Sequence, residues 1–325
     1  MISSKSTCGT SVNESSVSNY EDFEARICFI IKDELILQLK TKSNPTMERP
    51  QDLGHIDSRT LADYILYRLG PMSHLKLQKL IYLIEGYHLA YFGQSLIDDD
   101  FEAWVHGPVS RNLYDALKDK SKIYGKLCYT PREGLSADGG PKLGFRLSGG
   151  QSQVIEYVLM KYGGVSGDSL EAITHLQTPW LSACSGVASD RRSRNQISRQ
   201  EMIDFFVAEI KKEFVERIKG FKEGLDFGWN GAEELPMETE SVNNAIAGVE
   251  AAVPGMLRGW NVFPSPNGTV RFAASGSRTA AISVGNTEFS YAAMCGDRVI
   301  KGRDSFSTDS FVNVLNNINT FFGNV

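Results

Sequence analysis

The sequence predicts an α+β fold: an N-terminal all-α domain, followed by a small α+β domain whose antiparallel β-meander is flanked by helices. Three observations support this prediction. The chain has 325 residues, enough for two domains that each bury a core. Between residues 55 and 214, apolar residues recur at the three-to-four-residue spacing of amphipathic helices. Beyond residue 220, glycine and asparagine turns separate short β-branched and aromatic runs, as in a meander.

Residues 1–54 are expected to form a flexible N-terminus with a β-hairpin and a linker. The first 19 residues are rich in Ser, Thr and Asn, and they offer little apolar area to offset the entropy lost on ordering. The apolar runs 27–31 and 35–39 are compatible with two strands of a hairpin or with one helix, and we favour the hairpin. Pro45 and Pro50 lie in the polar linker that follows.

The helices of residues 55–214 are predicted from their start and stop signals. Ser58 and Ser73 can cap the first two helices, and Gly70-Pro71 ends the first. Pro108 suits the first turn of a third helix, because the N–H that it lacks would be unpaired there. The second helix is apolar around most of its circumference, so we expect it to be central. Its apolar positions are Leu77, Leu80, Ile81, Ile84, Tyr87 and Tyr91.

Later helices follow in the same domain. Residues 124–145 are broken by glycine and proline and indicate a loop with a short hairpin, after which a helix spans 152–162. Asp168 followed by Glu171 resembles a capping box, and Ser198 followed by Glu201 repeats the device for a last helix that ends near residue 214.

The C-terminal domain, residues 221–325, is predicted to contain a helix, then a sheet, then a second helix. A helix over 241–253 precedes four or five antiparallel strands, which begin at Trp260 and are joined by turns at 266–268 and at Gly285-Asn286. A final helix over 308–322 can place its apolar side chains against one face of the sheet.

Composition excludes several classes of function. A net charge of −5 gives no overall attraction to nucleic acid or to an anionic membrane. The five cysteines include no CxxC pair, which is typical of free thiols in a reducing compartment, so we expect a cytoplasmic protein. No apolar run approaches the ~20 residues that span a bilayer, and no export signal is visible at the N-terminus.

No motif indicates catalysis, a metal or a cofactor. The histidines lack the HExxH spacing that places two imidazoles on one helix face around zinc. Gly139-Gly140 and Gly163-Gly164 lack the Lys-Ser/Thr of a phosphate loop, and nothing marks an activated thiolate. The C-terminal domain contains no histidine. We therefore expect no catalytic residues, no cofactor and no metal.

One basic cluster, Arg191, Arg192 and Arg194 with Arg199 nearby, precedes the last helix of the first domain. A solvated loop, a contact with an acidic protein partner and a contact with nucleic-acid phosphates are all compatible with it. Stacking aromatics are missing from the cluster, so nucleic acid is the least favoured of the three. Trp104 and Trp180 are expected to be core residues between helices.

Residues 55–214 resemble the Panacea domain of the SocA-like antitoxin family, which also includes phage-associated GepA-like proteins. The resemblance rests on the segments 75–82, 86–90, 101–104, 107–109 and 179–180, and the sequence departs from the family pattern at Val105-His106. The matching family-motif residues are Leu77, Lys79, Leu80, Tyr82, His88, Glu102, Trp104, Gly107, Pro108, Val109, Pro179 and Trp180.

The resemblance implies a cytoplasmic bacterial antitoxin with no catalytic residues of its own. Such a protein neutralises a toxin, encoded by an adjacent gene, by direct binding, and sometimes acts as an adaptor that delivers the toxin to a protease. Two alternatives stay open. The chain could be a self-inhibited toxin–antitoxin fusion with its activity in residues 221–325, or a DNA-binding regulator that uses Arg191, Arg192 and Arg194.

Overall fold

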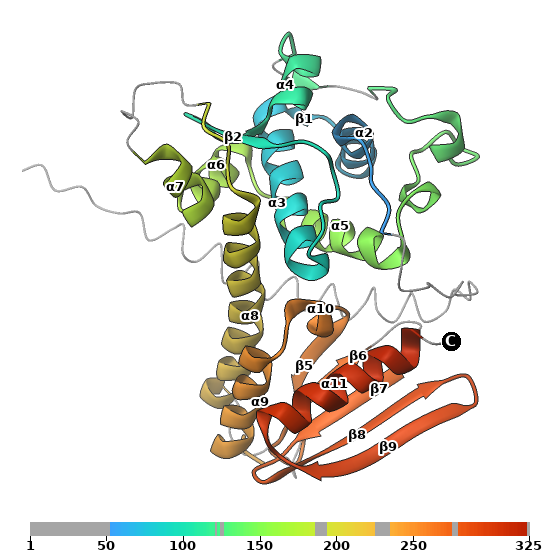
Figure 1. Ribbon diagram of the computed structural model, residues 1–325, viewed down its shortest axis with the longest axis vertical. Helices are drawn as coiled ribbons and strands as arrows, with labels where there is room; N and C mark the ends of the chain where they lie inside the picture. The colour runs from blue at the N-terminus through green and yellow to red at the C-terminus, as the bar shows by residue number, and fades with distance from the viewer. Residues whose placement is uncertain are drawn as a thin grey trace, which may run out of the picture. The chain divides into compact units, whose positions relative to one another are not determined.

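The computed structural model describes residues 53–120, 122–123, 127–185, 194–224, 235–274 and 279–323. It is a mixed α and β structure, which confirms the α+β class (Figure 1). The hairpin predicted for residues 27–39 lies outside the described residues. None of the helices in the described ranges combines the length and the hydropathy that crossing a membrane requires.

Helix α3 (His74–Phe92) is the centre of the first core, as its apolar circumference predicts. Ser73 caps it by accepting a hydrogen bond from the Lys76 N–H, and Gly93 ends it in the left-handed conformation. The helices packed against it include α2 (Ser58–Leu69), α5 (Gly149–Tyr162), α6 (Gly167–His175) and α8 (Arg199–Gly224), and α7 (Thr178–Cys184) packs against α6 and α8.

The loop and helix start predicted between residues 101 and 110 are in fact a β-hairpin. Strands β2 (Phe101–Trp104) and β3 (Gly107–Ser110) pair antiparallel, and helix α4 (Arg111–Leu117) begins only after Ser110, which caps it. Pro108 is therefore a strand residue. Its missing N–H costs no sheet hydrogen bond because β3 is an edge strand, while β2 is bonded on its other side to residues 195–197.

The all-α description of residues 55–214 is therefore wrong. Besides β2 and β3, the short strands β1 (Met72–Ser73) and β4 (Lys122–Ile123) pair antiparallel. In the predicted loop of residues 124–145, the described part holds two 3-10 turns, η1 (Arg132–Gly134) and η2 (Leu143–Phe145), and one isolated bridge between Leu135 and Pro141.

Several predicted helix ends shift. Asp57 rather than Ser58 caps α2, Ser148 starts α5 three residues early, and Ser166 rather than Asp168 caps α6. Helix α8 begins directly after Ser198 as predicted, but it continues to residue 224. It continues because Phe214 and Ile218 extend its apolar face, four residues apart, onto a second core.

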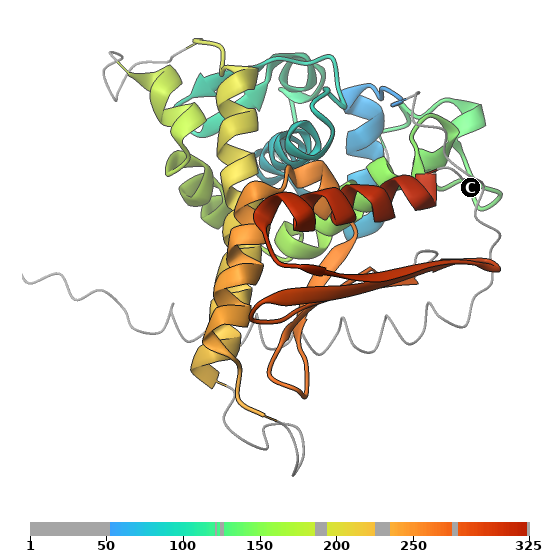
Figure 2. The ribbon, with the colours of Figure 1, turned by 60° about the horizontal axis from the view of Figure 1, so that its bottom comes forward.

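The second core lies under a five-stranded meander, as the turn signals predict. Its strands run in chain order β5-β6-β7-β8-β9, and every pair is antiparallel. Helices α9 (Thr239–Ala251) and α11 (Thr308–Gly323) cover one face, on which α9 packs against β6 and β7 (Figures 1 and 2). The strands are β5 (Trp260–Pro264), β6 (Val270–Ala274), β7 (Thr279–Val284), β8 (Glu288–Cys295) and β9 (Arg298–Ser305).

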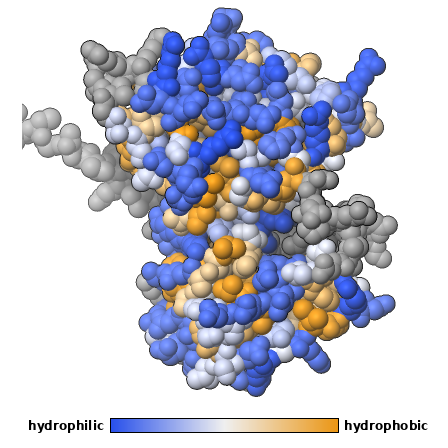
Figure 3. Space-filling model, in the orientation of Figure 1, coloured by the Kyte–Doolittle hydropathy of each residue, from blue (hydrophilic) through white to orange (hydrophobic). Residues whose placement is uncertain are grey.

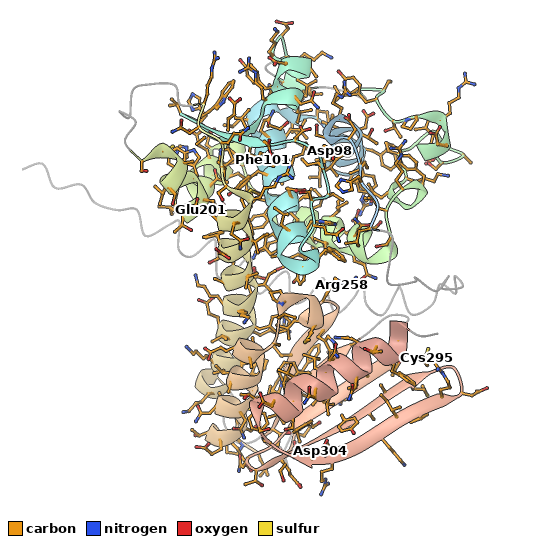
Figure 4. All side chains as sticks on the ribbon, viewed as in Figure 1. Asp98, Phe101, Glu201, Arg258, Cys295 and Asp304 are labelled. Carbon is orange, nitrogen blue, oxygen red and sulfur yellow. The ribbon has the colours of Figure 1, made fainter. Side chains whose placement is uncertain are left out.

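The short helix α10 (Pro254–Leu257) contacts α3, α8 and α11. Gly255 allows this approach, since a Cβ there would lie 2.8 Å from the Tyr91 carbonyl oxygen. The guanidinium of Arg258, the residue after α10 that Figure 4 labels, lies 4.8 Å from the centre of the Phe92 ring at the end of α3. Phe214 on α8 packs against both cores.

Two buried carboxylates organise loops of the first core. Asp63 on α2 accepts hydrogen bonds from four consecutive backbone N–H groups, residues 127–130, and from the Thr130 hydroxyl. Glu85 on α3 accepts from the backbone N–H groups of Leu96 and Ile97. Both side chains pair backbone donors that would otherwise be buried without partners.

Candidate functional site

Lys79, Gly107 and Thr174 meet where α3, the β2–β3 hairpin and α6 converge. The Lys79 side chain is fully buried, and its Nζ donates a hydrogen bond to the Pro108 carbonyl oxygen at 2.9 Å. Gly107 has a φ of +88°, and a Cβ there would lie 2.9 Å from both Lys79 Nζ and Thr174 Oγ1. Glycine is the residue that fits this conformation and this space.

Burial makes the Lys79 ammonium unusual. Desolvation lowers the pKa of Lys79 to about 7, and the negative charge of Glu171 on α6 acts in the opposite direction. The Glu171 carboxylate also lies 3.0 Å from Nδ1 of His106, which is in the exposed turn between β2 and β3. Glu171 therefore connects the buried lysine electrostatically to the hairpin turn.

A pair of stacked rings fixes α7 against the same turn. The Trp180 indole N–H donates to the Trp104 carbonyl oxygen at 3.1 Å, and the Trp180 ring stacks on His175 with centroids 4.2 Å apart. Burial lowers the pKa of His175. This ring therefore favours its neutral form, and α6, α7 and the hairpin form one frame.

The two tryptophans are not equivalent core residues. Trp180 is partly buried against the first core, which agrees only in part with the prediction. Trp104 is also only partly buried, and it donates its indole N–H to Glu102 at 2.6 Å. Its ring contacts Tyr114 and lies under the Arg111 guanidinium, so Trp104 packs at the surface of the hairpin.

This frame carries three exposed apolar side chains. Leu176 follows α6 and is 80% exposed, Leu181 on α7 is 47% exposed, and Val105 in the hairpin turn is 41% exposed. Each is adjacent in the chain to one of the stacked or hydrogen-bonded residues, His175, Trp180 or Trp104. We call Val105, Leu176 and Leu181 the α6–α7 patch. Hydrophobic and hydrophilic residues are interspersed over the face of the molecule that Figure 3 shows.

Buried polar atoms lie on both sides of Leu176. His175 Nε2 and Gln177 Oε1 are buried and have no hydrogen-bond partner among the described residues. Leaving buried polar atoms unpaired costs about 1–3 kcal/mol each. Leu176, which lies between them, is 80% exposed. The surface where α6 and α7 meet is therefore energetically unfavourable in the chain without a partner.

The remaining family-motif residues are structural. Leu77, Leu80 and Tyr82 are fully buried on α3. His88 is buried as well, with Nδ1 2.8 Å from the Gln94 carbonyl oxygen and Nε2 2.9 Å from the Gln151 amide nitrogen, and burial lowers its pKa to about 4. Val109 and Pro179 are buried in β3 and in the first turn of α7, and Glu102 is partly buried on β2.

The basic cluster is only partly described. Arg191 and Arg192 lie outside the described residues, and Arg194 is exposed. Arg199 forms an ion pair with Asp100 at 3.0 Å, so its charge is already compensated. The three interpretations of this cluster stay predictions.

The described residues contain no group of three or more His, Cys, Asp or Glu side chains that could hold a metal ion. Cys128, Cys184 and Cys295 are free thiols, as expected, while Cys8 and Cys28 lie outside the described residues.

Leu176 and Leu181 were not identified from the sequence as site residues, because each fits the apolar pattern of a helix. The signal that was available is their position at the junction of two short helices separated by Gln177, where little core can cover them. Glu171 was interpreted only as a capping residue, although it faces His106.

Comparisons with known proteins agree with the motif. The model of the family described as "Antitoxin SocA-like, Panacea domain" matches residues 77–181. Antitoxin SocA of Caulobacter vibrioides (strain NA1000 / CB15N) is 32% identical over 138 residues, which cover 40% of this chain and 71% of that protein. No solved structure matches the chain.

Proposed function

Because this chain belongs to the SocA-like antitoxin family, we propose that it is an antitoxin that neutralises a protein toxin by binding it directly. The observation that carries the proposal is the α6–α7 patch, in which Leu176 is 80% exposed next to two buried unpaired polar atoms. Residues 77–181, which match the family model, include all three members of this patch.

The α6–α7 patch becomes more favourable when a partner covers it. An exposed apolar side chain gains free energy only when another molecule removes it from water, and the gain is about 25 cal/mol per Å² of apolar area. The hydrogen bonds of Lys79 and Trp180 join the hairpin to α3 and to α7 in the chain by itself, before any partner arrives. A preformed surface loses little conformational entropy on binding, which favours affinity.

The proposal assigns the chain a binding role in the cytoplasm, without catalysis or a cofactor. The partner is a toxin encoded by an adjacent gene, and delivery of that toxin to a protease is a second step of the same role. The alternative of a DNA-binding regulator stays a prediction, because Arg191 and Arg192 lie outside the described residues and Arg194 is exposed. The alternative of a toxin–antitoxin fusion predicts that the full chain needs no second gene.

Co-expression with the neighbouring gene tests the proposal. We expect that gene to stop growth when it is expressed without this chain, and growth to return when both are expressed. Leu176→Asp should abolish the rescue without unfolding the protein, because the side chain is almost fully in water. Leu235→Asp is a matched control, since Leu235 is 45% exposed but lies outside the matched region.

Two results would contradict the proposal. The first is a neighbouring gene that leaves growth unaffected when it is expressed without this chain. The second is a Leu176→Asp variant that protects as well as the parent chain, which would exclude the α6–α7 patch as the surface that recognises the toxin.

A further inference from the structure

Strand β9 is an open edge of the C-terminal sheet. All eight of its residues pair with β8 on one side, and no described residue pairs with its other side. The opposite edge strand, β5, packs next to α8. Along β9, alternate backbone N–H and C=O groups therefore point away from the sheet without a strand partner.

A groove of about 510 Å³ lies beside this edge, between β9 and α11. Figure 2 shows α11 above the β8–β9 hairpin. Val299 and Ile300 line the groove from the strand, and Val314 and Ile318 line it from the helix. Val299 is 57% exposed, and its side chain lies on the face of β9 opposite to Ile300 because side chains alternate along a strand. The remaining lining residues are Tyr291 on β8, Lys301 on β9 and Asn317 on α11.

The charges of β9 favour an acidic neighbour. The strand carries Arg298, Lys301 and Arg303 against one acidic residue, Asp304. Lys301 has no hydrogen bond or ion pair with any described residue, while Arg303 pairs with Glu288 at 3.2 Å. Pairing two copies of β9 would bring cations close to one another, which is unfavourable across a sheet. A second copy of the chain is therefore disfavoured at this edge.

We propose that the open edge of β9 and the groove beside α11 bind an extended segment of a partner protein in which apolar and acidic residues alternate. The segment becomes a sixth strand through backbone hydrogen bonds with β9. Its apolar side chains enter the groove between β9 and α11. Its acidic side chains then point to the face that carries Val299, Lys301 and Arg303, because side chains alternate along a strand; Val299 and Lys301 also border the groove.

This site lies outside residues 77–181 and does not rest on toxin binding at the α6–α7 patch. When a peptide adds a strand to a sheet edge, the backbone hydrogen bonds provide affinity and the side-chain pockets provide specificity. Here β9 provides the hydrogen bonds and the groove selects the side chains. The partner is thus recognised by an extended conformation and by alternation, two features that a helical segment lacks.

Fluorescence anisotropy with the purified full chain tests the inference. The probe is a fluorescein-labelled peptide of alternating valine and glutamate, eight residues long like β9. Two further peptides carry N-methyl groups on every second amide, in one phase or in the other. We expect saturable binding of the parent peptide and a loss of at least about tenfold in affinity for one N-methylated phase only, because one set of N–H groups faces the edge.

Substitutions of the chain test whether the groove and the charge of Lys301 contribute to peptide binding. Asn317→Trp fills the groove and should weaken binding by at least about tenfold, and Lys301→Glu should do the same. The matched controls are Asn316→Trp, which is exposed on α11 outside the groove, and Lys219→Glu, which is exposed on α8. Both should stay within about twofold of the parent chain.

Four results would overturn the inference. They are an absence of binding of the parent peptide, equal binding of both N-methylated phases, an equal effect of Asn316→Trp and Asn317→Trp, and a valine–lysine peptide that binds as well as the valine–glutamate peptide. In the first of these cases, a concentration-dependent dimer in sedimentation that the peptide does not dissociate would assign the edge to a second copy instead.

Discussion

The Lys79 ammonium donates a hydrogen bond to the carbonyl oxygen of Pro108 at 2.9 Å, inside the protein. This bond joins the central helix to the edge strand of the hairpin. Burying an ammonium group costs free energy when its hydrogen bonds and its charge are only partly paired. The stability of this region therefore depends on the space around Lys79 and on the pH. The first two predictions follow from it.

Gly107→Ala should destabilise the protein. A left-handed backbone conformation is strained for alanine, and the new methyl group would press on Lys79 and Thr174, so we expect a loss of about 1–3 kcal/mol in the free energy of unfolding. Chemical denaturation measures this loss. Gly164→Ala is the control, because a Cβ there meets nothing within 4 Å, and it should change stability by less than about 0.5 kcal/mol. Equal effects of the two variants would contradict the strained role of Gly107.

Lys79 should make the protein more stable as the pH rises from about 7 towards 10. The pKa of Lys79 is lowered to about 7 by burial, whereas the unfolded chain has a lysine pKa of about 10.5. Between these values the unfolded state binds more protons, so stability rises with pH and is lost as the pH falls through about 7. Lys79→Met removes this contribution, and the difference between the melting temperatures of parent and variant should therefore change over this range. A constant difference would show that Lys79 does not titrate there.

Glu85 should have the opposite dependence at lower pH. Burial raises its pKa to about 7 from an ordinary value of 4.5, although the Leu96 and Ile97 N–H groups favour the charged form. The folded state then binds more protons between these values. Its contribution is fully present below about pH 4.5 and is lost as the pH rises through about 7. Glu85→Gln keeps an acceptor for both N–H groups, and it should flatten the melting temperature between pH 4.5 and 7. An unchanged profile would argue against protonation of this carboxyl group.

Asp63→Ala should release the loop that follows residue 126. The substitution leaves four backbone N–H groups and the Thr130 hydroxyl without their acceptor, so we expect a loss of about 3 kcal/mol or more. Amide hydrogen exchange should accelerate most at residues 127–130. Exchange that is uniform along the chain would mean that the carboxylate supports global stability rather than this loop. Asp119→Ala, at an exposed position after α4, is the control.

Local signals were sufficient to place many elements. Ser73 and Ser198 start their helices as predicted because a capping side chain acts within three residues, and the turns of the meander are equally local. Pro108 was misinterpreted because a missing N–H suits a helix start and an edge strand equally well. The decision depends on residues 195–197, far along the chain, which pair with β2 and leave β3 at the edge.

The candidate site was only half predictable. Lys79, Gly107, Pro108 and Trp180 belong to the family motif, and the structure brings them into one frame. Leu176 could not be identified in this way, because its 80% exposure depends on how α6 and α7 meet and not on its own sequence context. A leucine at the end of an amphipathic helix is expected to be buried until the neighbouring elements are known.

The cations of β9 also affect how strongly this protein aggregates at high protein concentration. An open strand edge invites pairing between molecules, and Arg298, Lys301 and Arg303 oppose such pairing through repulsion. This repulsion reaches about 8 Å at physiological ionic strength but only about 3 Å in 1 M salt. High-salt buffers should therefore screen the repulsion that opposes edge-to-edge aggregation, whereas low-salt buffers preserve this repulsion.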